Sequence, residues 1–214
     1  MATGSLKAVK GFTMIELVVT MAVLAILVAL AAPSFTSVIN NNRLTGNANE
    51  LLSTLQSARM EAVRRNAPIV ICRNDTPDTG TTCNTGAGAW QGWMSFVDNG
   101  GTVFNADGTV NVAGTGTASN GELEGNETVL YSGTFTPPSQ LQASPAISGG
   151  NQRIRYSPDG LAYSDAGALL NAQFAFCIPT TSPLENTRLI TIGSGSRMNI
   201  SRFDGGGLCA APAN

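Results

Sequence analysis

The hydrophobic pattern of the chain begins with one long apolar run. Residues 12–33 read FTMIELVVTMAVLAILVALAAP and carry a single charge, at Glu16. As a helix that rises about 1.5 Å per residue, this segment would be roughly 30 Å long, close to the thickness of the hydrocarbon core of a bilayer. The pattern therefore predicts a membrane-spanning helix.

A second helical pattern follows in residues 34–67. Apolar residues recur there at spacings of three and four, which is typical of an amphipathic helix. Pro68 disfavours the helical conformation at the residue before it, so the helix is expected to end by Asn66. Residues 12–66 are thus predicted to form one rod whose second half supports a domain. The residues expected to form the apolar face of that half are Phe35, Val38, Ile39, Leu51, Leu52, Leu55, Ala58, Ala62 and Val63.

Beyond Pro68, short β-type runs alternate with turns such as the one at Asp159-Gly160. Residues 99–127 are rich in Gly, Thr and Asn and are expected to form a long loop or a loose hairpin. The predicted fold class is α+β, in which an antiparallel sheet domain of residues 68–214 packs on the distal half of a protruding helix. The predicted strands cover residues 69–73, 93–97, 128–132, 153–156, 173–178, 188–192 and 198–201.

Composition excludes much of catalysis. None of the 214 residues is histidine, and only 12% are charged. The chain therefore has no His-ligated zinc site and no Ser-His-Asp or Cys-His pair. Because no combination of acid, base and nucleophile stands out, we expect no enzyme activity and no cofactor. Tyr156 and the two tryptophans are expected to be core residues.

Positive charge is unevenly distributed. Lys7 and Lys10 are the only lysines and precede the apolar run, so the positive-inside rule places residues 1–11 in the cytoplasm and the domain across the membrane. No cleavage site of the secretory type follows the run. Without residues 1–11, ten arginines face 14 acidic residues, and this net negative charge opposes a general nucleic-acid-binding surface.

The segment KGFTMIEL, from Lys10 to Leu17, closely resembles the processing signal of type IV pilins and type II secretion pseudopilins. The resemblance implies that a prepilin peptidase removes a leader of residues 1–11 by cutting after Gly11 and methylates the new amine of Phe12. It also implies that the Glu16 carboxylate neutralises the terminal amine of a neighbouring subunit during assembly, and that Pro33 kinks the helix. Opposite charges in a low dielectric offset each other's desolvation, which supports the role of Glu16. Alternatively, Glu16 lies near the interface and reaches the water.

Several further fragments resemble the GspH/FimT group of minor pilins and pseudopilins. They are SARMEAVRRN at residues 57–66, Gly92-Trp93, the Ser157-Pro158-Asp159-Gly160 turn and the final RLITIGSGSRMNIS stretch. The resemblance implies a FimU/FimT-type minor pilin in the tip or priming complex of a type IV pilus. Its partners would be the prepilin peptidase, other minor pilins and the major pilin. The protein would cross the inner membrane once with a periplasmic domain, then join a filament at the cell surface. The alternative is a GspH-like pseudopilin of type II secretion.

All four cysteines lie in the part of the chain predicted to cross the membrane, to a location where disulfides persist. They permit three pairings, and the sequence does not decide among them. We favour Cys72 with Cys83, which closes a short loop, and Cys177 with Cys209, which would pin the C-terminal tail. A metal site is disfavoured because neither Cys-x-x-Cys spacing nor histidine is present. A calcium site in the acidic loop from Asp98 to Gly108 is also disfavoured, because its spacing does not match a known calcium loop.

The arginines near the C-terminus raise a second function. Some FimT-type proteins, which this chain resembles, bind double-stranded DNA through a Gly-Arg-x-Arg element. Here the corresponding stretch reads Gly195-Ser196-Arg197, with no arginine two positions later. Arg188, Arg197 and Arg202 could still cluster and contact phosphates. The competing interpretation is a solvated sheet edge or a contact with neighbouring minor pilins.

Overall fold

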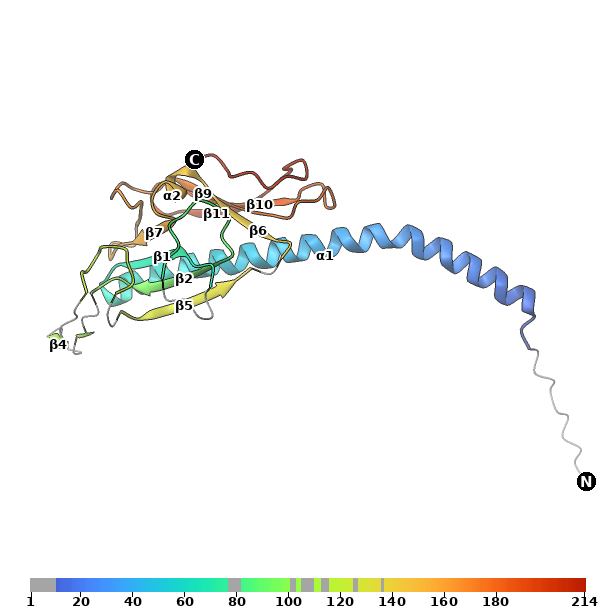
Figure 1. Ribbon diagram of the computed structural model, residues 1–214, viewed down its shortest axis with the longest axis horizontal. Coiled ribbons are helices and arrows are strands. Elements are labelled where there is room, and N and C mark those ends of the chain that lie inside the picture. Colours follow the sequence, from blue (N-terminus) through green and yellow to red (C-terminus); the bar gives the residue numbers. More distant parts are fainter. Residues whose placement is uncertain are drawn as a thin grey trace, which may run out of the picture.

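The structure, a computed structural model, describes residues 11–76, 82–100, 103–104, 110–112, 116–124, 127–135 and 137–214, without the side chains of residues 30–34, 103–104 and 110–112. Figure 1 shows one long helix, α1 (Met14–Arg65), whose C-terminal half is covered by a β-rich domain and whose N-terminal half projects from it. We name the end of the domain nearest Asn40 the proximal end, and the end nearest Arg65 the distal end. Lys7 and Lys10 lie outside the described residues.

The predicted helix of residues 12–66 is confirmed to within two residues at each end. At its C-terminal end, Asn66 adopts the left-handed conformation, with φ of 49°, and the Ala67 N–H donates to the Ala62 carbonyl at 3.3 Å. This arrangement satisfies a carbonyl that the helix leaves unpaired. The α1 backbone is continuous through Pro33, whose side chain lies outside the described part, so the predicted kink stays a prediction. In the part of the chain that the structure describes, no helix combines the length and the apolar character needed to span a membrane.

The apolar face predicted for the second half of α1 is partly wrong. Phe35, Val38, Ile39 and Val63 are at least half exposed. The residues that α1 buries against the domain share one phase of the helix, spaced by three and four positions. Phe35, Val38, Ile39 and Val63 all lie at least about 100° around the helix from this phase, at 100° per residue, so they point away from the domain. The buried set is Leu44, Ala48, Leu51, Leu55, Ala58 and Ala62.

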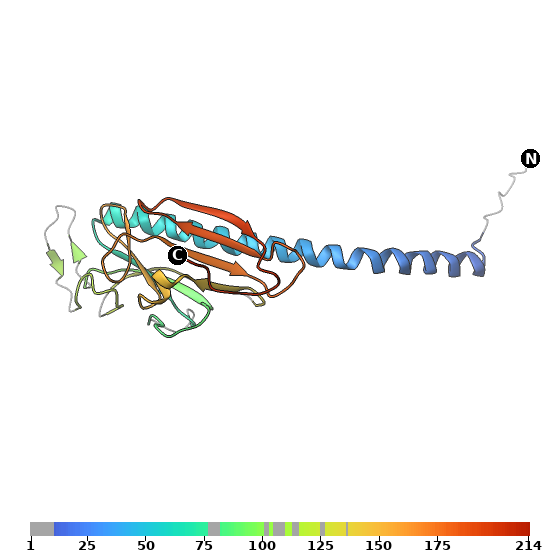
Figure 2. The ribbon, with the colours of Figure 1, turned by 90° about the horizontal axis from the view of Figure 1, so that it is seen from above.

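Two antiparallel sheets form the domain. The first has the order β5-β2-β1-β7-β8 and the second the order β11-β10-β9-β6. Figure 2 shows the second sheet lying along the C-terminal half of α1. The strands of the first sheet are β1 (Ile69–Arg73), β2 (Gly92–Val97), β5 (Val129–Thr134), β7 (Arg153–Tyr156) and β8 (Ala162–Tyr163). Those of the second are β6 (Gln140–Ala143), β9 (Ala172–Cys177), β10 (Thr187–Ile192) and β11 (Met198–Phe203).

All seven predicted strands are present, with ends that differ by no more than two residues. The prediction missed β6, β8 and the one-turn helix α2 (Pro145–Ser148), because each is too short to show a periodicity. Within residues 99–127, the described part contains a small hairpin of β3 (Val103–Phe104) and β4 (Val110–Val112), in line with the predicted loose hairpin. The α+β fold class is therefore confirmed.

One continuous core lies between α1 and the inner faces of both sheets. Trp90 packs edge-on against Phe174, with 5.1 Å between ring centroids, and Phe135 packs against Phe176 in the same way at 4.8 Å. Trp90, Trp93 and Tyr156 are all buried, as predicted. Burial of these aromatic side chains is a large part of the hydrophobic stabilisation of the domain.

Candidate assembly site

The N-terminus of α1 is fixed by a capping interaction. Thr13 is extended, with φ of −81° and ψ of 153°, and its side-chain oxygen accepts the Glu16 N–H at 3.3 Å. Thr13 and Glu16 thus hold the N-cap and N3 positions of the helix, with the threonine side chain satisfying one free N–H group. The Glu16 carboxylate lies in the first turn, where the helix dipole favours negative charge. Thr13 was not predicted as a cap, although the spacing Thr-x-x-Glu is present in the sequence.

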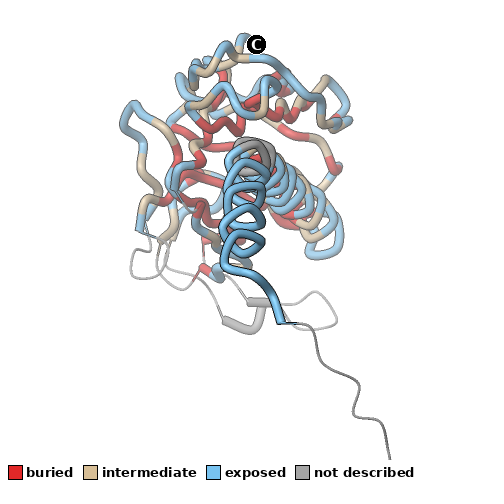
Figure 3. The backbone as a smooth tube through the Cα atoms, turned by 90° about the vertical axis from the view of Figure 1, so that its right-hand side faces the viewer, coloured by how far each residue is buried: buried red, intermediate tan, exposed pale blue. Residues whose placement is uncertain are grey.

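Residues 11–29 are all exposed (Figure 3), and most of them are apolar. Phe12, next to the predicted cleavage position at Gly11, is 82% exposed. Soluble proteins rarely expose continuous apolar surface of this extent. An apolar environment or another protein is therefore expected to cover it. The large apolar side chains that are at least half exposed here are Phe12, Met14, Ile15, Leu17, Val18, Val19, Met21, Val23, Leu24, Ile26, Leu27 and Val28.

At the distal end, three sequence fragments that lie far apart in the chain meet. Arg59 Nη1 donates to the Ser196 carbonyl at 3.2 Å, and Ser196 Oγ accepts the Ala162 N–H at 2.6 Å. Gly160 has φ of +76°, and a β-carbon there would lie 3.3 Å from Val63 Cγ2. A turn that passes this close to α1 with a left-handed residue requires glycine. These contacts explain the Arg-x-Glu-Ala, Ser-Pro-Asp-Gly and Gly-Ser motifs as one packing site.

Glu61, in the same helix end, accepts hydrogen bonds from Arg64 Nη2 and Arg65 Nε, both at 2.6 Å. These bonds to the charged form lower the pKa of Glu61 from 4.5 to about 2. Because the two arginines lie in the last turn of α1, they also complement the helix dipole. The charge cluster therefore stabilises the end of the helix rather than forming a reactive site.

The structure pairs Cys72 with Cys83 and Cys177 with Cys209, which is the pairing that the sequence analysis favoured. The second disulfide joins the C-terminal tail to Cys177, the last residue of β9. Asn186 adds to this attachment, because its side chain donates to the Leu208 carbonyl at 3.2 Å and accepts the Gly205 N–H at 2.8 Å. The tail is therefore fixed near the proximal end of the domain by one covalent bond and two hydrogen bonds.

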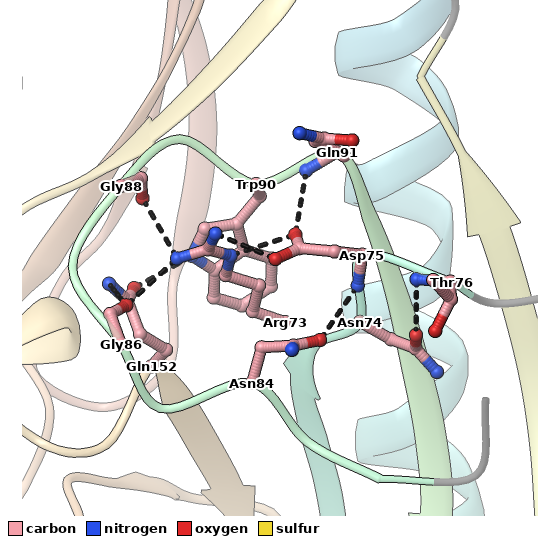
Figure 4. Close-up of polar contacts among 10 residues, drawn as sticks. All are labelled: Arg73, Asn74, Asp75, Thr76, Asn84, Gly86, Gly88, Trp90, Gln91 and Gln152. Carbon is pink, nitrogen blue, oxygen red and sulfur yellow. Dashed lines mark hydrogen bonds and ion pairs between the residues drawn. The ribbon is translucent and has the colours of Figure 1, made fainter.

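A polar network that the sequence analysis missed holds the loop between β1 and β2 (Figure 4). Arg73 pairs with Asp75 in a two-pronged contact, at 2.8 Å from Nε and 2.7 Å from Nη2, and donates from Nη1 to the Gly86 carbonyl at 2.8 Å. Gln152 accepts the Trp90 Nε1 hydrogen at 2.8 Å and donates to the same Gly86 carbonyl at 3.1 Å. With the Cys72–Cys83 disulfide, this network fixes the loop to both β1 and β7. The only sequence signal was an arginine at the end of a strand, two residues before an aspartate.

The three arginines predicted to cluster do not form one patch. Arg188 is only 2% exposed and donates to the Asn41 side chain of α1 and to the Glu185 carbonyl. Arg202 is opposite Arg188 in the ladder, is 61% exposed at its side chain and pairs with Glu185 at 3.5 Å. Arg197 lies in the turn at the other end of that hairpin. Because strand register separates Arg197 from the pair and packing buries Arg188, the three arginines do not gather into the one cluster that the sequence allowed.

Asp98, the first residue of the acidic loop, has a structural role, while Asp107 and Gly108 lie outside the described residues. Asp98 is fully buried and accepts the N–H groups of Asn120 at 3.2 Å and Gly121 at 2.7 Å. Glu127 accepts the Gly100 N–H at 2.7 Å. Burial raises the pKa of both carboxyl groups, while these hydrogen bonds act in the opposite direction. In the described part of the chain, no group of three or more His, Cys, Asp or Glu residues could hold a metal ion.

Comparison with known proteins gives two family matches. Residues 47–196 match the family described as Type II transport protein GspH, and residues 6–32 match the prokaryotic N-terminal methylation motif. The fold is similar to that of the type IV minor pilin FimU of Pseudomonas aeruginosa, with a TM-score of 0.43 and 17% identity over 75% of this chain and 90% of that one. It is also similar to the minor pseudopilin EpsH of the Vibrio cholerae type 2 secretion system, with a TM-score of 0.41 and 10% identity over 75% and 97% of the two chains. No curated protein sequence matches the chain.

The GspH match begins within α1 and ends in the turn between β10 and β11, so it includes the packing site of Arg59, Ala162 and Ser196. It covers well over half of the chain, and the methylation motif covers the processing signal in front of it. This protein therefore belongs to the Type II transport protein GspH family, the minor pilins and pseudopilins of type IV pili and type II secretion.

Proposed function

We propose that this protein is a minor pilin that is cut after Gly11, methylated on Phe12 and built into the tip or priming complex of a type IV pilus. The observation that carries the proposal is the exposed apolar half of α1, which begins directly after the predicted cleavage position. A surface of this kind needs lipid before assembly and neighbouring helices afterwards. The proposed partners are the prepilin peptidase, the other minor pilins and the major pilin, and the proposed first location is the inner membrane.

The position of Glu16 supports the same proposal. Among the described residues Glu16 takes part in no ion pair, and it lies in a turn whose other side chains are apolar and exposed. Cleavage after Gly11 would place a positive amine on Phe12, at a helix N-terminus where the dipole disfavours positive charge. The Glu16 carboxylate of a neighbouring subunit would offset the cost of this amine, and the amine would offset the cost of the unpaired carboxylate. Opposite charges attract strongly in a low dielectric.

The first test is the intact mass of the protein purified from cells that contain a prepilin peptidase. We expect a chain that begins at Phe12 and carries one extra methyl group. The matched control is a Gly11→Arg chain, in which we expect the leader to be retained. A wild-type chain that keeps residues 1–11 and has no methyl group would contradict the proposal.

The second test separates membrane insertion from assembly. In Glu16→Ala we expect the protein to remain in the membrane fraction but to be lost from filaments sheared from the cell surface. Glu50→Ala is the control, because Glu50 is an exposed glutamate on the same helix. Equal incorporation of the two variants would refute the proposed role of Glu16.

A second candidate function is a minor pseudopilin of type II secretion, which the description of the matched family favours. The two functions differ in what deletion of the protein removes. A pilus component is needed for surface filaments, whereas a pseudopilin is needed for the release of secreted proteins. Loss of secretion with normal surface filaments in a deletion strain would select the pseudopilin and reject the pilus role.

A further inference from the structure

Three exposed apolar side chains gather at the proximal end of the domain. Leu184 is 68% exposed, Leu208 is 70% exposed and Phe203 is 52% exposed. They come from the loop between β9 and β10, from the tail and from the end of β11. Figure 1 draws these three segments beside the middle of α1. Exposed large apolar residues from three separate segments at one end of a domain mark a contact surface.

Hydrogen bonds and strand register fix this end of the domain to α1. The Asn40 side chain donates to the Ser182 carbonyl at 2.9 Å, two residues before Leu184. Thr187 is opposite Phe203 in the ladder, and the neighbouring Asn186 donates to the Leu208 carbonyl. The three apolar side chains are thus carried at the level of Asn40 on α1 and do not depend on a free loop.

The height of Asn40 above the proposed membrane segment follows from helix geometry. Seven residues separate it from Pro33, which corresponds to about 10 Å along the helix axis. The headgroup layer on each side of a bilayer is roughly 5–8 Å thick. The proximal end of the domain would therefore lie at the outer boundary of the headgroups when residues 12–33 span the hydrocarbon core.

We propose that the proximal end of the domain, through Leu184, Leu208 and Phe203, rests on the lipid surface in which α1 is anchored before assembly. Interfacial leucine and phenylalanine side chains gain free energy by entering the boundary between headgroups and acyl chains. Arg202 next to Phe203 is paired with Glu185 at 3.5 Å, so the apolar side chains and not charge carry the proposed contact. The contact would hold the domain in one orientation relative to the bilayer. This inference rests on the proposed anchoring of residues 12–33.

The test uses the full chain in vesicles of phosphatidylethanolamine and phosphatidylglycerol whose acyl chains carry bromine near the headgroups. Bromine quenches tryptophan fluorescence on contact, and the native Trp90 and Trp93 are buried. We expect Leu184→Trp and Leu208→Trp chains to lose about half of the added fluorescence, since interfacial side chains enter a bilayer by about 5–10 Å. Leu169→Trp is the matched control, because Leu169 is 50% exposed, bridges to Tyr163 and precedes the distal end of β9. We expect its fluorescence to stay unchanged.

The outcomes separate this inference from the proposed anchoring. If the chains float with the vesicles but the added tryptophans at positions 184 and 208 are not quenched, the lipid contact is wrong while the anchoring stands. A blue shift of their emission without quenching would identify a protein neighbour as the occupant and would overturn the proposal. Equal quenching at position 169 would also overturn it. Chains that do not float with the vesicles would overturn both the contact and the anchoring.

Discussion

The Arg59 guanidinium donates to the Ser196 carbonyl at 3.2 Å across a sequence separation of 137 residues. Ser196 is 2% exposed, so its carbonyl lies where water does not replace a lost donor. The contact joins the last turns of α1 to the turn between β10 and β11. It is the point at which the helix fixes the far end of the second sheet.

Replacing Arg59 with alanine is therefore expected to destabilise the domain by about 1–3 kcal/mol, because a buried acceptor loses its partner. The measurement is urea unfolding of the full chain in detergent, followed by near-ultraviolet circular dichroism. Arg43→Ala, which removes an exposed arginine from the same helix, is the control and should change stability little. A similar loss in both variants would show that helix charge, and not the Ser196 contact, matters.

Replacing Arg188 and replacing Arg202 are expected to change the free energy of unfolding by different amounts, although the two residues are opposite each other in the ladder. Arg188→Ala leaves the Asn41 side chain and two backbone carbonyls without their donor, so we expect a loss of about 1–3 kcal/mol. Arg202→Ala removes an exposed side chain and should leave the free energy of unfolding nearly unchanged. A gel-shift titration with double-stranded DNA should accompany both measurements. A DNA affinity that falls in Arg188→Ala with unchanged stability would argue against the structural role.

Removing each of the two disulfides is expected to lower the free energy of unfolding by a different amount. The Cys177–Cys209 bridge spans 32 residues, and the chain-entropy relation gives about 4 kcal/mol for its loss. The Cys72–Cys83 bridge spans 11 residues, and the same relation gives about 3 kcal/mol. Paired Cys→Ser variants, compared by urea unfolding, test this order. A larger loss from the shorter loop would indicate that the Arg73 network, and not chain entropy, dominates.

Stability should depend on pH through Glu61. Its pKa is lowered from 4.5 to about 2, so the folded state favours the carboxylate. The resulting stability is fully present above pH 4.5 and is lost as the pH falls toward 2. Since Glu61 and its two arginine partners lie near the surface, we expect them to contribute no more than about 1 kcal/mol to the free energy of unfolding. The Glu61→Gln substitution should remove this part of the acid dependence. Melting temperatures across this pH range provide the measurement.

Asp98 and Glu127 are expected to change stability with pH in the opposite direction to Glu61. Burial raises their pKa values, so the folded state binds their protons more readily than the unfolded chain does. Their protonated forms add stability at low pH, and that part is lost as the pH rises through the raised values. An acid dependence that is identical in wild type and Glu61→Gln would mean that Glu61 contributes nothing measurable.

The sequence by itself determined the long helix, most of the strands and their order along the chain. The apolar run, the spacing of three and four after it, Pro68 and the turn residues are local signals, and each acts on a few neighbouring positions. For that reason α1 and seven strands were predicted to within two residues. The processing signal at Gly11 and Phe12 is also local, and a family match confirms the motif that contains it.

Only the tertiary structure decided which side chains these elements bury and join. Ile39 and Leu51 were both expected on the apolar face of α1, yet only Leu51 lies in the phase of the helix that the domain covers. Arg188 and Arg197 are both arginines of one hairpin, yet packing against Asn41 buries the first and leaves the second in a turn. Such outcomes depend on contacts between residues more than a hundred positions apart. Local periodicity and composition carry no information about those contacts, because the same pattern is compatible with many packing partners.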